Sequence, residues 1–494
     1  WGALNLVGGT EAFRSTVQAQ QERIFDEVDD WILKNGFETS EEGWRADIHF
    51  YCVEMPVPEW DEWKIPLCPS WAVAPKTKTW VELVPIEDEK RFGFVVRYGG
   101  KGYAEASKGT KQGAEVVCPP ALWEIFKRDG CHQQMPRTIP YSQLMKNSGG
   151  LRNWEKREFM ARSSDFLQER LYCIRWRKPD WIDERGNERK GDFVYREPRA
   201  HDWDVEQQVI NHLAGVFDRW QDAGWVPNWR VEPGAETARI NREKGWTYWH
   251  HLFNPRQLLI AGAYSEKVGA SDKNIRPALT LLLGILAECS SKLNVWNAGA
   301  GGGAGSTQRM FLQKGYAMLY NYATRSFSSL ASKLNPEYPY KELAVDKSVV
   351  LCDARKVRNA CHVWITDPPY ADAVNYEELS EVFLAWYSPH LKGAFPDWYA
   401  DSMRTTAVKG EDAPFRVAMA ECYLNLAQHM PDDGLQVLMF THKSTDVWED
   451  LALIMWAAGL QVKQVWSIAT ETQAGIKDGN YVQATYNMVL RKRT

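Results

Sequence analysis

The hydrophobic residues in the first part of the chain are spaced as in a helix. Within Gln18–Lys34, apolar residues recur every four positions on a charged background. They are Ile24, Val28 and Ile32. Residues at this spacing share one face of a helix. Residues 1–50 are therefore predicted to be mainly helical.

Short runs of β-type residues follow, with Pro and Gly between them. The runs are Ile48–Val53, Thr79–Val84 and Gly93–Tyr98. Runs of this kind are typical of strands separated by turns, and they predict a small β-rich insert over residues 51–135. Residues 136–255 are polar, aromatic and rich in Arg.

The next pattern is strongly apolar with helical spacing. It covers residues 256–290 and ends near Cys289. The Gly-rich segment Asn297–Ser306 follows, and a second long helical stretch is predicted from about Thr307 to Leu334.

From Lys347 onward, strand and helix patterns alternate. The predicted strands are Ser348–Cys352, Val363–Thr366, Leu435–Thr441, Val462–Thr470 and Thr485–Arg491. The predicted helices are Tyr376–Tyr387, Pro414–His429 and Asp446–Ala458. Alternation of this kind predicts an α/β fold, here the closing half of a doubly wound sheet that ends in a hairpin. Residues 256–494 are assigned to this domain.

The bulk composition is that of an ordinary globular chain. With 494 residues it has room for about two to four domains. The net charge of −5 provides no global attraction to nucleic acid, so a DNA-binding surface has to come from local clustering of cations.

One such cluster lies in the segment Arg152–Arg199. Its cations include Arg152, Lys156, Arg157, Arg162, Arg170, Arg175, Arg177 and Lys178, and its aromatic residues include Trp154, Phe159, Phe166, Tyr172, Trp176 and Trp181. Phosphate contacts and stacking surfaces are what a nucleic-acid channel requires, which makes residues 136–255 a candidate DNA-recognition region. The alternative is a solvated surface whose cations pair with its own acids, and the sequence favours neither.

The nine Cys residues form no CxxC pair, which indicates reduced thiols and a cytosolic setting. The sequence has no signal-peptide pattern and no apolar run of membrane-spanning length, so we expect a cytoplasmic protein without a membrane partner. The first residue is Trp1, and we expect a processed or truncated product or one part of a larger protein.

Two sets of Cys and His residues are candidates for a metal site. Cys52, Cys68, Cys118 and Cys131, with His132, bracket the β-rich insert. The short-spaced pairs of a zinc site are missing, which favours isolated thiols and leaves zinc doubtful. His250 and His251 are adjacent, so in a regular element they point to different faces, and a structural role is favoured over a metal or substrate site.

The tetrapeptide Asp367-Pro368-Pro369-Tyr370 follows the predicted strand Val363–Thr366. An exocyclic amino group on a nucleic-acid base is a poor nucleophile because its lone pair is delocalised into the ring. Two hydrogen-bond acceptors, the Asp367 carboxylate and the Pro368 carbonyl, would free that lone pair. The prolines hold the turn rigid, and Tyr370 would stack on a base turned out of the duplex. The alternative is a strand that ends in a Pro-Pro turn.

Two further features are candidates for binding the methyl donor, S-adenosylmethionine (SAM). Asp353 ends the predicted strand Ser348–Cys352, at the edge of the sheet where α/β folds bind ligands, and it could accept a hydrogen bond from the adenine of SAM. The alternative is an Asp that starts a turn. Gly299 and Gly301 lie in the Gly-rich segment, where a backbone could approach a nucleotide closely; the alternative is a flexible loop.

Together with the tetrapeptide, the stretch Tyr370–Leu391 (YADAVNYEELSEVFLAWYSPHL) resembles the adenine-specific DNA methylases that contain a zinc ribbon. Several members of this family occur in phage-defence islands. Similar stretches are Trp44–Glu54, Phe166–Trp176 and Trp246–Leu259. The resemblance implies a Rossmann-like, SAM-dependent methyltransferase that acts on adenine N6 in double-stranded DNA.

The chain departs from the family in two respects. Family members carry their Gly-rich SAM loop before the region that corresponds to Trp1, and their cysteines form an intact zinc ribbon. The SAM loop is therefore expected either at Asn297–Ser306 or outside this chain, in a preceding segment or in a separate polypeptide such as another subunit of a defence system. Two other functions stay open: a DNA-binding or scaffold component without catalysis, and methylation of RNA or of a protein amide.

Overall fold

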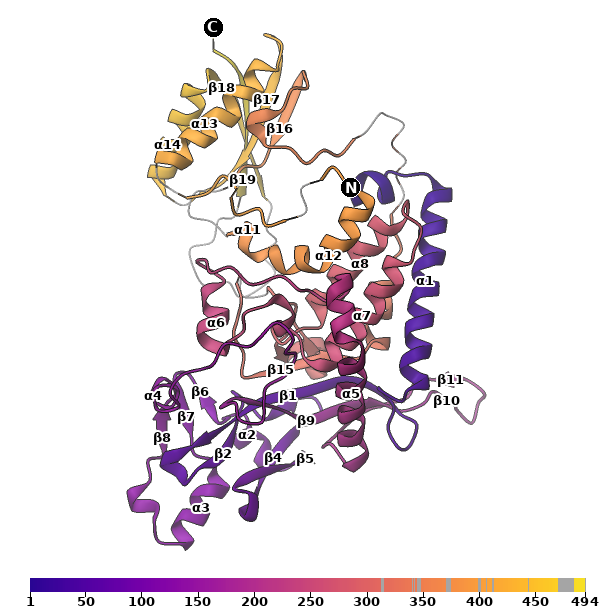
Figure 1. Ribbon diagram of the computed structural model, residues 1–494, viewed down its shortest axis with the longest axis vertical. Coiled ribbons are helices and arrows are strands. Elements are labelled where there is room, and N and C mark those ends of the chain that lie inside the picture. The colour runs from indigo at the N-terminus through magenta and orange to yellow at the C-terminus, as the bar shows by residue number, and fades with distance from the viewer. Residues whose placement is uncertain are drawn as a thin grey trace. The chain divides into compact units, whose positions relative to one another are not determined.

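The computed structural model describes residues 1–311, 315–339, 341, 343, 348–369, 375–398, 401–405, 407–410, 413–442, 444–469 and 484–493. The protein is a mixed α/β chain with several sheets, 40% helix and 23% strand. It divides into two compact units (Figure 1). The first comprises Trp1–Lys347 and Glu381–Ala400, and the second comprises Ser348–Ser380 and Asp401–Thr494. Residues 256–347, assigned above with the carboxyl-terminal domain, belong to the first unit.

The first unit is built on a five-stranded antiparallel sheet with β1 near its centre. The strands are β12 (Phe193–Arg196), β9 (Gln168–Arg177), β1 (Arg45–Val57), β15 (Asn321–Arg325) and β2 (Trp63–Leu67). Both faces of β1 are covered. Ile48 and Phe50 pack with strands of the insert, and Ala46 and Tyr51 pack with Trp176 on the other face.

The long helices of the first unit gather beside this sheet (Figure 1). They are α1 (Glu11–Lys34), α5 (Ala200–Ala223), α7 (Pro255–Gly269), α8 (Arg276–Cys289) and α12 (Glu381–Ala394). The helix predicted within Gln18–Lys34 is confirmed, and its amino end is capped by Thr10, whose side chain accepts from the Phe13 N–H. The apolar stretch 256–290 forms two helices, because Asp272 makes a turn with the N–H of Asn274 between them.

The β-rich insert forms two small sheets. Their strands are β3 (Ala72–Ala74), β4 (Thr79–Ile86) and β5 (Arg91–Tyr98) in one, and β6 (Lys111–Gln112), β7 (Glu115–Val117) and β8 (Thr138–Pro140) in the other. The helices between and after them are α2 (Gly102–Ala106), α3 (Pro120–Arg128) and α4 (Tyr141–Asn147). The strands predicted at Thr79–Val84 and Gly93–Tyr98 are confirmed and pair with each other. The run Ile48–Val53 belongs to β1 of the main sheet.

The remaining elements of the first unit are short. They are β10 (Trp181–Ile182), β11 (Glu188–Arg189), α6 (Ala238–Lys244), β13 (Trp296–Asn297), α9 (Ala300–Gly303), β14 (Ser306–Thr307), α10 (Ala331–Leu334), the π-helix Ala3–Val7 and the 3-10 helices Pro58–Trp60, Glu87–Glu89, His132–Gln134, Trp249–Leu252 and Ser328–Leu330.

The helix predicted from Thr307 to Leu334 is wrong. Much of this stretch lacks helix, and Asn321–Arg325 forms the strand β15, which pairs with β1 from Ile48 to Cys52. Tyr322 and Ala323 are buried by this pairing. A partner some 270 residues away decides the conformation here, and local spacing does not report it.

The second unit contains a four-stranded sheet in the order β16 (Val363–Thr366), β17 (Leu435–Phe440), β19 (Ala484–Lys492), β18 (Leu460–Ala469). The β16–β17 pair is parallel, whereas β19 runs antiparallel to both of its neighbours. Its helices are α11 (Tyr376–Leu379), α13 (Ala413–Gln428), α14 (Thr445–Ala457) and the 3-10 turn Ala354–Lys356. The core forms where α13 and α14 cover one face of the sheet, around Leu438 and Leu490.

Four of the five strands predicted for this part are confirmed, and the closing hairpin is β18–β19. The strand predicted at Ser348–Cys352 is wrong. Residues 348–353 form no strand, and Val350 and Leu351 are 73% and 44% exposed. An apolar run of this kind becomes a strand only when a neighbour pairs with it.

No helix among the described residues has the length and apolar character needed to cross a bilayer.

Candidate functional site

Asp367, Pro368 and Pro369 leave the sheet of the second unit at the carboxyl end of β16. Asp367 and Pro369 are exposed, and Pro368 is half-buried. β16 is parallel to β17, so this is the edge at which open α/β sheets bind ligands. Tyr370, the fourth residue of the tetrapeptide, lies outside the described residues.

Helix α13 anchors the end of β16. The hydroxyl of Tyr423 lies 3.0 Å from the hydroxyl of Thr366, the residue before Asp367, and the two are hydrogen bonded. Thr366 also reaches the carbonyl of Val437 on β17, at 3.4 Å. Burial raises the pKa of Tyr423, and the charge of Asp367 adds to this shift. Tyr423 therefore remains a neutral hydroxyl that holds the strand beside the candidate carboxylate.

Asp353 lies at the start of a turn, as in the alternative to a SAM-binding role. Its carboxylate accepts from the backbone N–H of Arg355 at 2.9 Å and forms an ion pair with the Arg355 guanidinium at 2.9 Å. These contacts lower the pKa of Asp353. The prediction that Asp353 ends a buried strand is wrong, because the preceding residues have no strand to pair with. Its carboxylate is engaged by Arg355.

The same helix holds the Asp353 turn. The side-chain amide of Asn425 donates to the carbonyls of Ala354 and Val357, at 2.9 and 3.1 Å. Asn425 lies two positions after Tyr423 on α13. Segments that carry Asp353 and Asp367 are thus both fastened to this part of α13. Tyr423 and Asn425 were not predicted from the sequence, because their partners lie 57 and 71 positions away along the chain.

A small hollow lies beside Pro369, between α13, α14 and β17. It is lined by Pro369, Phe415, Met419, Phe440, Val447, Asp450, Leu451 and Ile454. Its volume of about 20 Å³ has room for roughly one water molecule and is too small for a purine. A flipped base would therefore have to bind outside this hollow.

The Gly-rich segment differs from the strand-to-helix turn that a nucleotide-binding loop requires. It connects the two-residue strands β13 and β14, which pair antiparallel to each other. Gly301 and Gly302 have φ of 59° and 67° and interrupt α9, so no continuous helix begins here. Gly299, whose N–H donates to the Asn297 side chain, precedes this kink.

The loop is fastened to the first unit by its own backbone. The Ala304 carbonyl accepts from Arg175 and from Tyr195, both at 3.0 Å, and the Gly303 carbonyl accepts from the Lys76 N–H at 3.1 Å. Gly305 has no room for a side chain, because a Cβ there would lie 2.0 Å from Trp296. These contacts explain the glycines structurally. Gly299 and Gly301 also lie in a different unit from Asp367.

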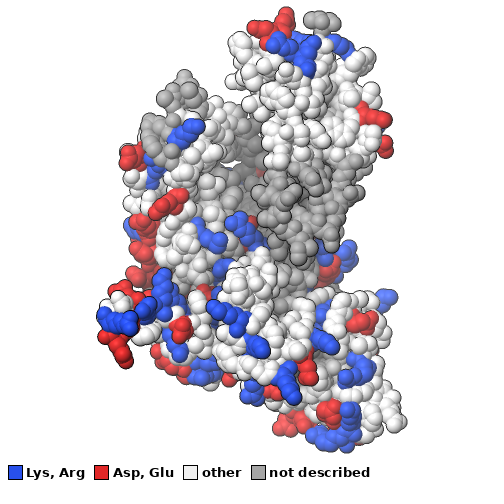
Figure 2. Space-filling view, turned by 180° about the vertical axis from the view of Figure 1, so that it is seen from behind, with Lys and Arg blue, Asp and Glu red and all other residues white. Residues whose placement is uncertain are grey.

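The six Arg residues named in the candidate DNA-recognition region are paired with acids. The ion pairs are Arg152–Asp165, Arg157–Asp222, Arg162–Glu155, Arg170–Glu54, Arg175–Asp47 and Arg177–Asp180. Tyr172 and Trp176 are buried in the main sheet, where they cannot stack on bases. Figure 2 shows Lys and Arg interspersed with Asp and Glu over this face of the protein. The pairing matches a surface whose cations are balanced by its own acids.

The cysteines around the insert are separate thiols. Cys52 and Cys68 pack in one core cluster, and Cys118 packs in another. The thiols of Cys68 and Cys131 each lie near a backbone carbonyl, at 2.9 and 3.5 Å. Burial raises the pKa of the Cys68 thiol to about 12, so it stays protonated. Within the described part of the chain, no three His, Cys, Asp or Glu side chains gather as a metal-binding set.

His250 and His251 have a structural role. Both are fully buried, and their ring nitrogens lie 2.9 Å and 3.1 Å from the carbonyls of Glu158 and Glu155. Both residues lie in the 3-10 helix Trp249–Leu252, with their ring centroids 4.2 Å apart.

Comparisons of this chain with models of protein families, with curated protein sequences and with solved structures found no match.

Proposed function

We propose that the second unit is the target-base half of a SAM-dependent DNA methyltransferase that modifies adenine N6. The observation that carries this proposal is the placement of Asp367-Pro368-Pro369 at the carboxyl end of a strand parallel to its neighbour, on the exposed rim of the sheet. The Asp367 carboxylate and the Pro368 carbonyl accept from the two N–H groups of the target amine. Tyr370, outside the described residues, stacks on the base.

These acceptors have a specific chemical effect. Hydrogen bonds to both N–H groups draw the amine towards a pyramidal geometry and localise its lone pair, which can then attack in line. The two prolines fix their backbone φ, so the acceptors are oriented before the base arrives. The Tyr423–Thr366 hydrogen bond fixes the end of β16 in the same way.

The parallel β16–β17 pair supports a doubly wound sheet in which β16 would be an inner strand, whereas the antiparallel β19 between β17 and β18 departs from the simple order. In the common doubly wound order 3-2-1-4-5-6, strands 1 and 4 are neighbours and the ligand binds where they meet. β16, followed by its parallel neighbour β17, corresponds to strands 4 and 5. Among the described residues, β16 pairs with β17 alone, so the place of strand 1 beside it is open.

Apolar residues on and near β16 are also exposed. Val363 and Ile365 on β16 are 51% and 68% exposed, and Val350 and Leu351 form an apolar run without a strand partner. In the common order, the strand that precedes strand 4 along the chain lies at the far side of strands 2 and 1. The run at residues 348–352 would pair only after those two strands are in place.

The contacts of the candidate SAM residues do not support a SAM site built from them alone. The carboxylate of Asp353 is engaged by Arg355, and Gly299 and Gly301 belong to a strand-to-strand turn of the other unit. We therefore infer that the SAM loop is supplied by a further polypeptide segment that adds parallel strands to the open edge of β16. The methyl group comes from SAM bound to that segment.

The test is transfer of a labelled methyl group from SAM to duplex DNA, with the chain alone and with an extract of its native host. Wild-type protein transfers label in at least one arm, and Asp367→Ala lowers the rate about 10²- to 10⁴-fold. Asp432→Ala is the matched control, because Asp432 is 99% exposed in the same unit. Equal rates for wild type and Asp367→Ala in both arms contradict the proposal. RNA as acceptor distinguishes an RNA methyltransferase.

The lack of a SAM site among the described residues also favours a second function, a DNA-binding or scaffold component of a defence complex. Calorimetry separates the two. A scaffold binds duplex DNA and binds no SAM, whether the chain is alone or joined by the missing strands. The methyltransferase binds SAM once the missing strands are added.

A further inference from the structure

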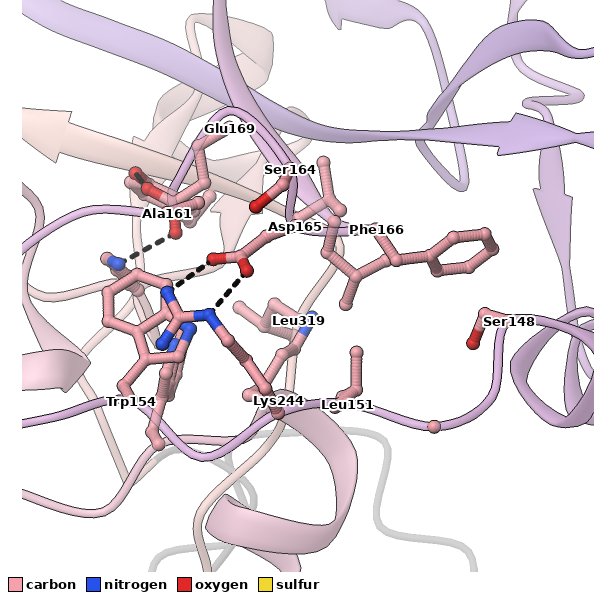
Figure 3. Close-up of a pocket in the computed structure, with 17 residues that line it drawn as sticks. Ser148, Leu151, Trp154, Ala161, Ser164, Asp165, Phe166, Glu169, Lys244 and Leu319 are labelled. Carbon is pink, nitrogen blue, oxygen red and sulfur yellow. Dashed lines mark hydrogen bonds and ion pairs between the residues drawn. The ribbon is translucent and has the colours of Figure 1, made fainter.

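A pocket of about 220 Å³ lies in the first unit, against the main sheet (Figure 3). Val53 of β1, Glu169 of β9 and Tyr322 of β15 line its floor, and Lys244 at the end of α6 closes one side. The loop that runs from Ser148 to Leu167 forms the rest of the wall, together with Trp246, Lys292 and Leu319. The pocket is independent of the methyltransferase proposal.

Most charges in this pocket are balanced by a partner. The guanidinium of Arg152 makes two hydrogen bonds to the Asp165 carboxylate, at 2.5 and 2.7 Å. The ammonium of Lys292 lies 2.7 Å from Glu169, which also accepts from the Tyr322 hydroxyl at 2.9 Å. Figure 3 shows Asp165 and Glu169 joined to these two cations by dashed lines.

Lys244 is the exception. Its side chain is buried, with 6% of the residue exposed, and its ammonium has no hydrogen-bond acceptor among the described residues. Its Nζ lies 4.4 Å from the centroid of the Tyr320 ring. Burial lowers the pKa of Lys244 to about 8, so the ammonium form still predominates at neutral pH. A buried ammonium without a partner is costly, and it is a strong donor for an anion that enters.

The lining also defines what kind of anion would bind. Three cations and two carboxylates line the pocket, and Arg152 is shared between Asp165 and Glu158, so Lys244 is the lining cation that forms no ion pair among the described residues. Leu151, Phe166 and Leu319 supply apolar surface. The Lys292 ammonium makes cation–π contacts with the indoles of Trp154 and Trp246, at 5.1 and 4.7 Å from their ring centroids. A ligand with one oxyanion on a small apolar body matches both the charge and the walls.

We propose that this pocket binds a small molecule that carries one oxyanion, a carboxylate or a phosphate, on an apolar body, and that Lys244 donates to the oxyanion. Asp165 is paired with Arg152 and Glu169 with Lys292, which offsets their repulsion of an anion, and the charge of Glu169 also favours the ammonium form of Lys244. The Lys244 ammonium provides a charge-assisted hydrogen bond in a site that is largely shielded from water.

The first test uses benzoate and inorganic phosphate as probes of the full chain. Lysines are converted to ¹³C-dimethyl-lysines, and their NMR signals are followed during each titration. The Lys244 signal, assigned by its loss in Lys244→Met, shifts saturably with benzoate, with phosphate or with both. Saturation by benzoate alone assigns a carboxylate on an apolar body, and saturation by phosphate alone assigns a phosphate. No saturable shift with either probe overturns the proposal.

The second test separates a binding role from a structural one. Ligand-induced stabilisation is measured by thermal unfolding for wild type, Lys244→Met and the control Lys127→Met, whose lysine is exposed on α3. Lys244→Met weakens binding of the probe at least about tenfold and does not lower the unfolding temperature without probe, because it removes an unpaired buried charge. Lys127→Met binds as wild type. A Lys244→Met protein that binds as wild type, or that is destabilised without probe, overturns the proposal.

Discussion

Single buried polar residues hold together distant parts of the first unit. His250 illustrates this: its ring contacts the Glu158 carbonyl and the Gln221 side-chain amide, at 2.9 and 3.3 Å. His250 thereby fastens the loop from Ser148 to Leu167, which lines the pocket of Figure 3, to helix α5. The sequence suggested a structural role for this residue, but the partners lie 92 and 29 positions away and were not predictable.

The burial of His250 predicts a pH dependence of stability. Burial lowers its pKa from 6.5 to about 3, so the unfolded chain binds a proton that the folded chain excludes. The stabilisation is complete above the unfolded pKa of about 6.5 and is lost as the pH falls towards 3. Replacement by Gln should reduce the slope of unfolding free energy against pH by up to about 1.4 kcal/mol per unit.

Denaturant unfolding at several pH values between about 4 and 6.5 measures this slope. His212→Gln is the control, since His212 is exposed on α5 in the same unit. Equal slopes for His250→Gln and wild type would show that His250 does not take up a proton on unfolding.

Arg256 is a second residue whose role depends on burial. It is 2% exposed and forms an ion pair with Glu206 at 2.5 Å, and it also donates to the Phe37 carbonyl. Arg256→Met leaves Glu206 without its cation, so we expect a loss of about 3–5 kcal/mol in unfolding free energy. Adding Glu206→Gln should recover part of that loss, and a double-mutant cycle measures the coupling. Additive effects of the two replacements would contradict the assignment.

At the scale of elements, close contact between helices explains a glycine that spacing alone does not. α8 packs on α12, and a Cβ at Gly284 would lie 1.6 Å from the Tyr387 hydroxyl. Gly284→Ala should therefore separate the two helices and cost about 1–3 kcal/mol. Thermal or denaturant unfolding measures the change.

The chain supplies a matched control for this substitution. Gly215 lies within α5, and nothing would lie within 4 Å of its Cβ. Gly215→Ala should stabilise the protein by about 0.5–1 kcal/mol, because alanine has the higher helix propensity. If Gly284→Ala also stabilises, the packing of α8 on α12 is not as close as the structure has it.

Strands show the limits of element prediction most clearly. Val363–Thr366 and Leu435–Phe440 were predictable, since each is a short apolar run. The strand β15 was not predicted, and a strand at Ser348–Cys352 was predicted wrongly. Both errors have the same cause. A strand forms where a neighbour supplies hydrogen bonds, and for these two segments the neighbour is remote or is not among the described strands.

At the scale of the whole molecule, β16 predicts self-association, because among the described strands it pairs on one side alone. Exposed edge strands with apolar side chains pair with other chains unless they are covered. The isolated chain should therefore associate as its concentration rises, and Ile365→Lys should shift it towards the monomer without loss of folding, because Ile365 is 68% exposed. Sedimentation velocity measures the distribution.

The control for this prediction is Val417→Lys. Val417 is 56% exposed on α13, away from the strand edge, so its replacement should leave association unchanged. Equal association of the Ile365→Lys and wild-type chains would show that the edge of β16 is not the contact.

The sequence by itself determined the first helix, the closing strands and the position of Asp367-Pro368-Pro369 at the end of one of them. These features depend on local spacing and on proline geometry, which neighbouring residues control. The tertiary structure alone decided that α13 fastens both candidate segments, that the Gly-rich turn joins two strands, and that most of the named Arg cations are paired. It also decided that Lys244 is buried with no hydrogen-bond acceptor within the described part of the chain. Each of these depends on contacts between residues far apart in the chain, and no local pattern records such contacts.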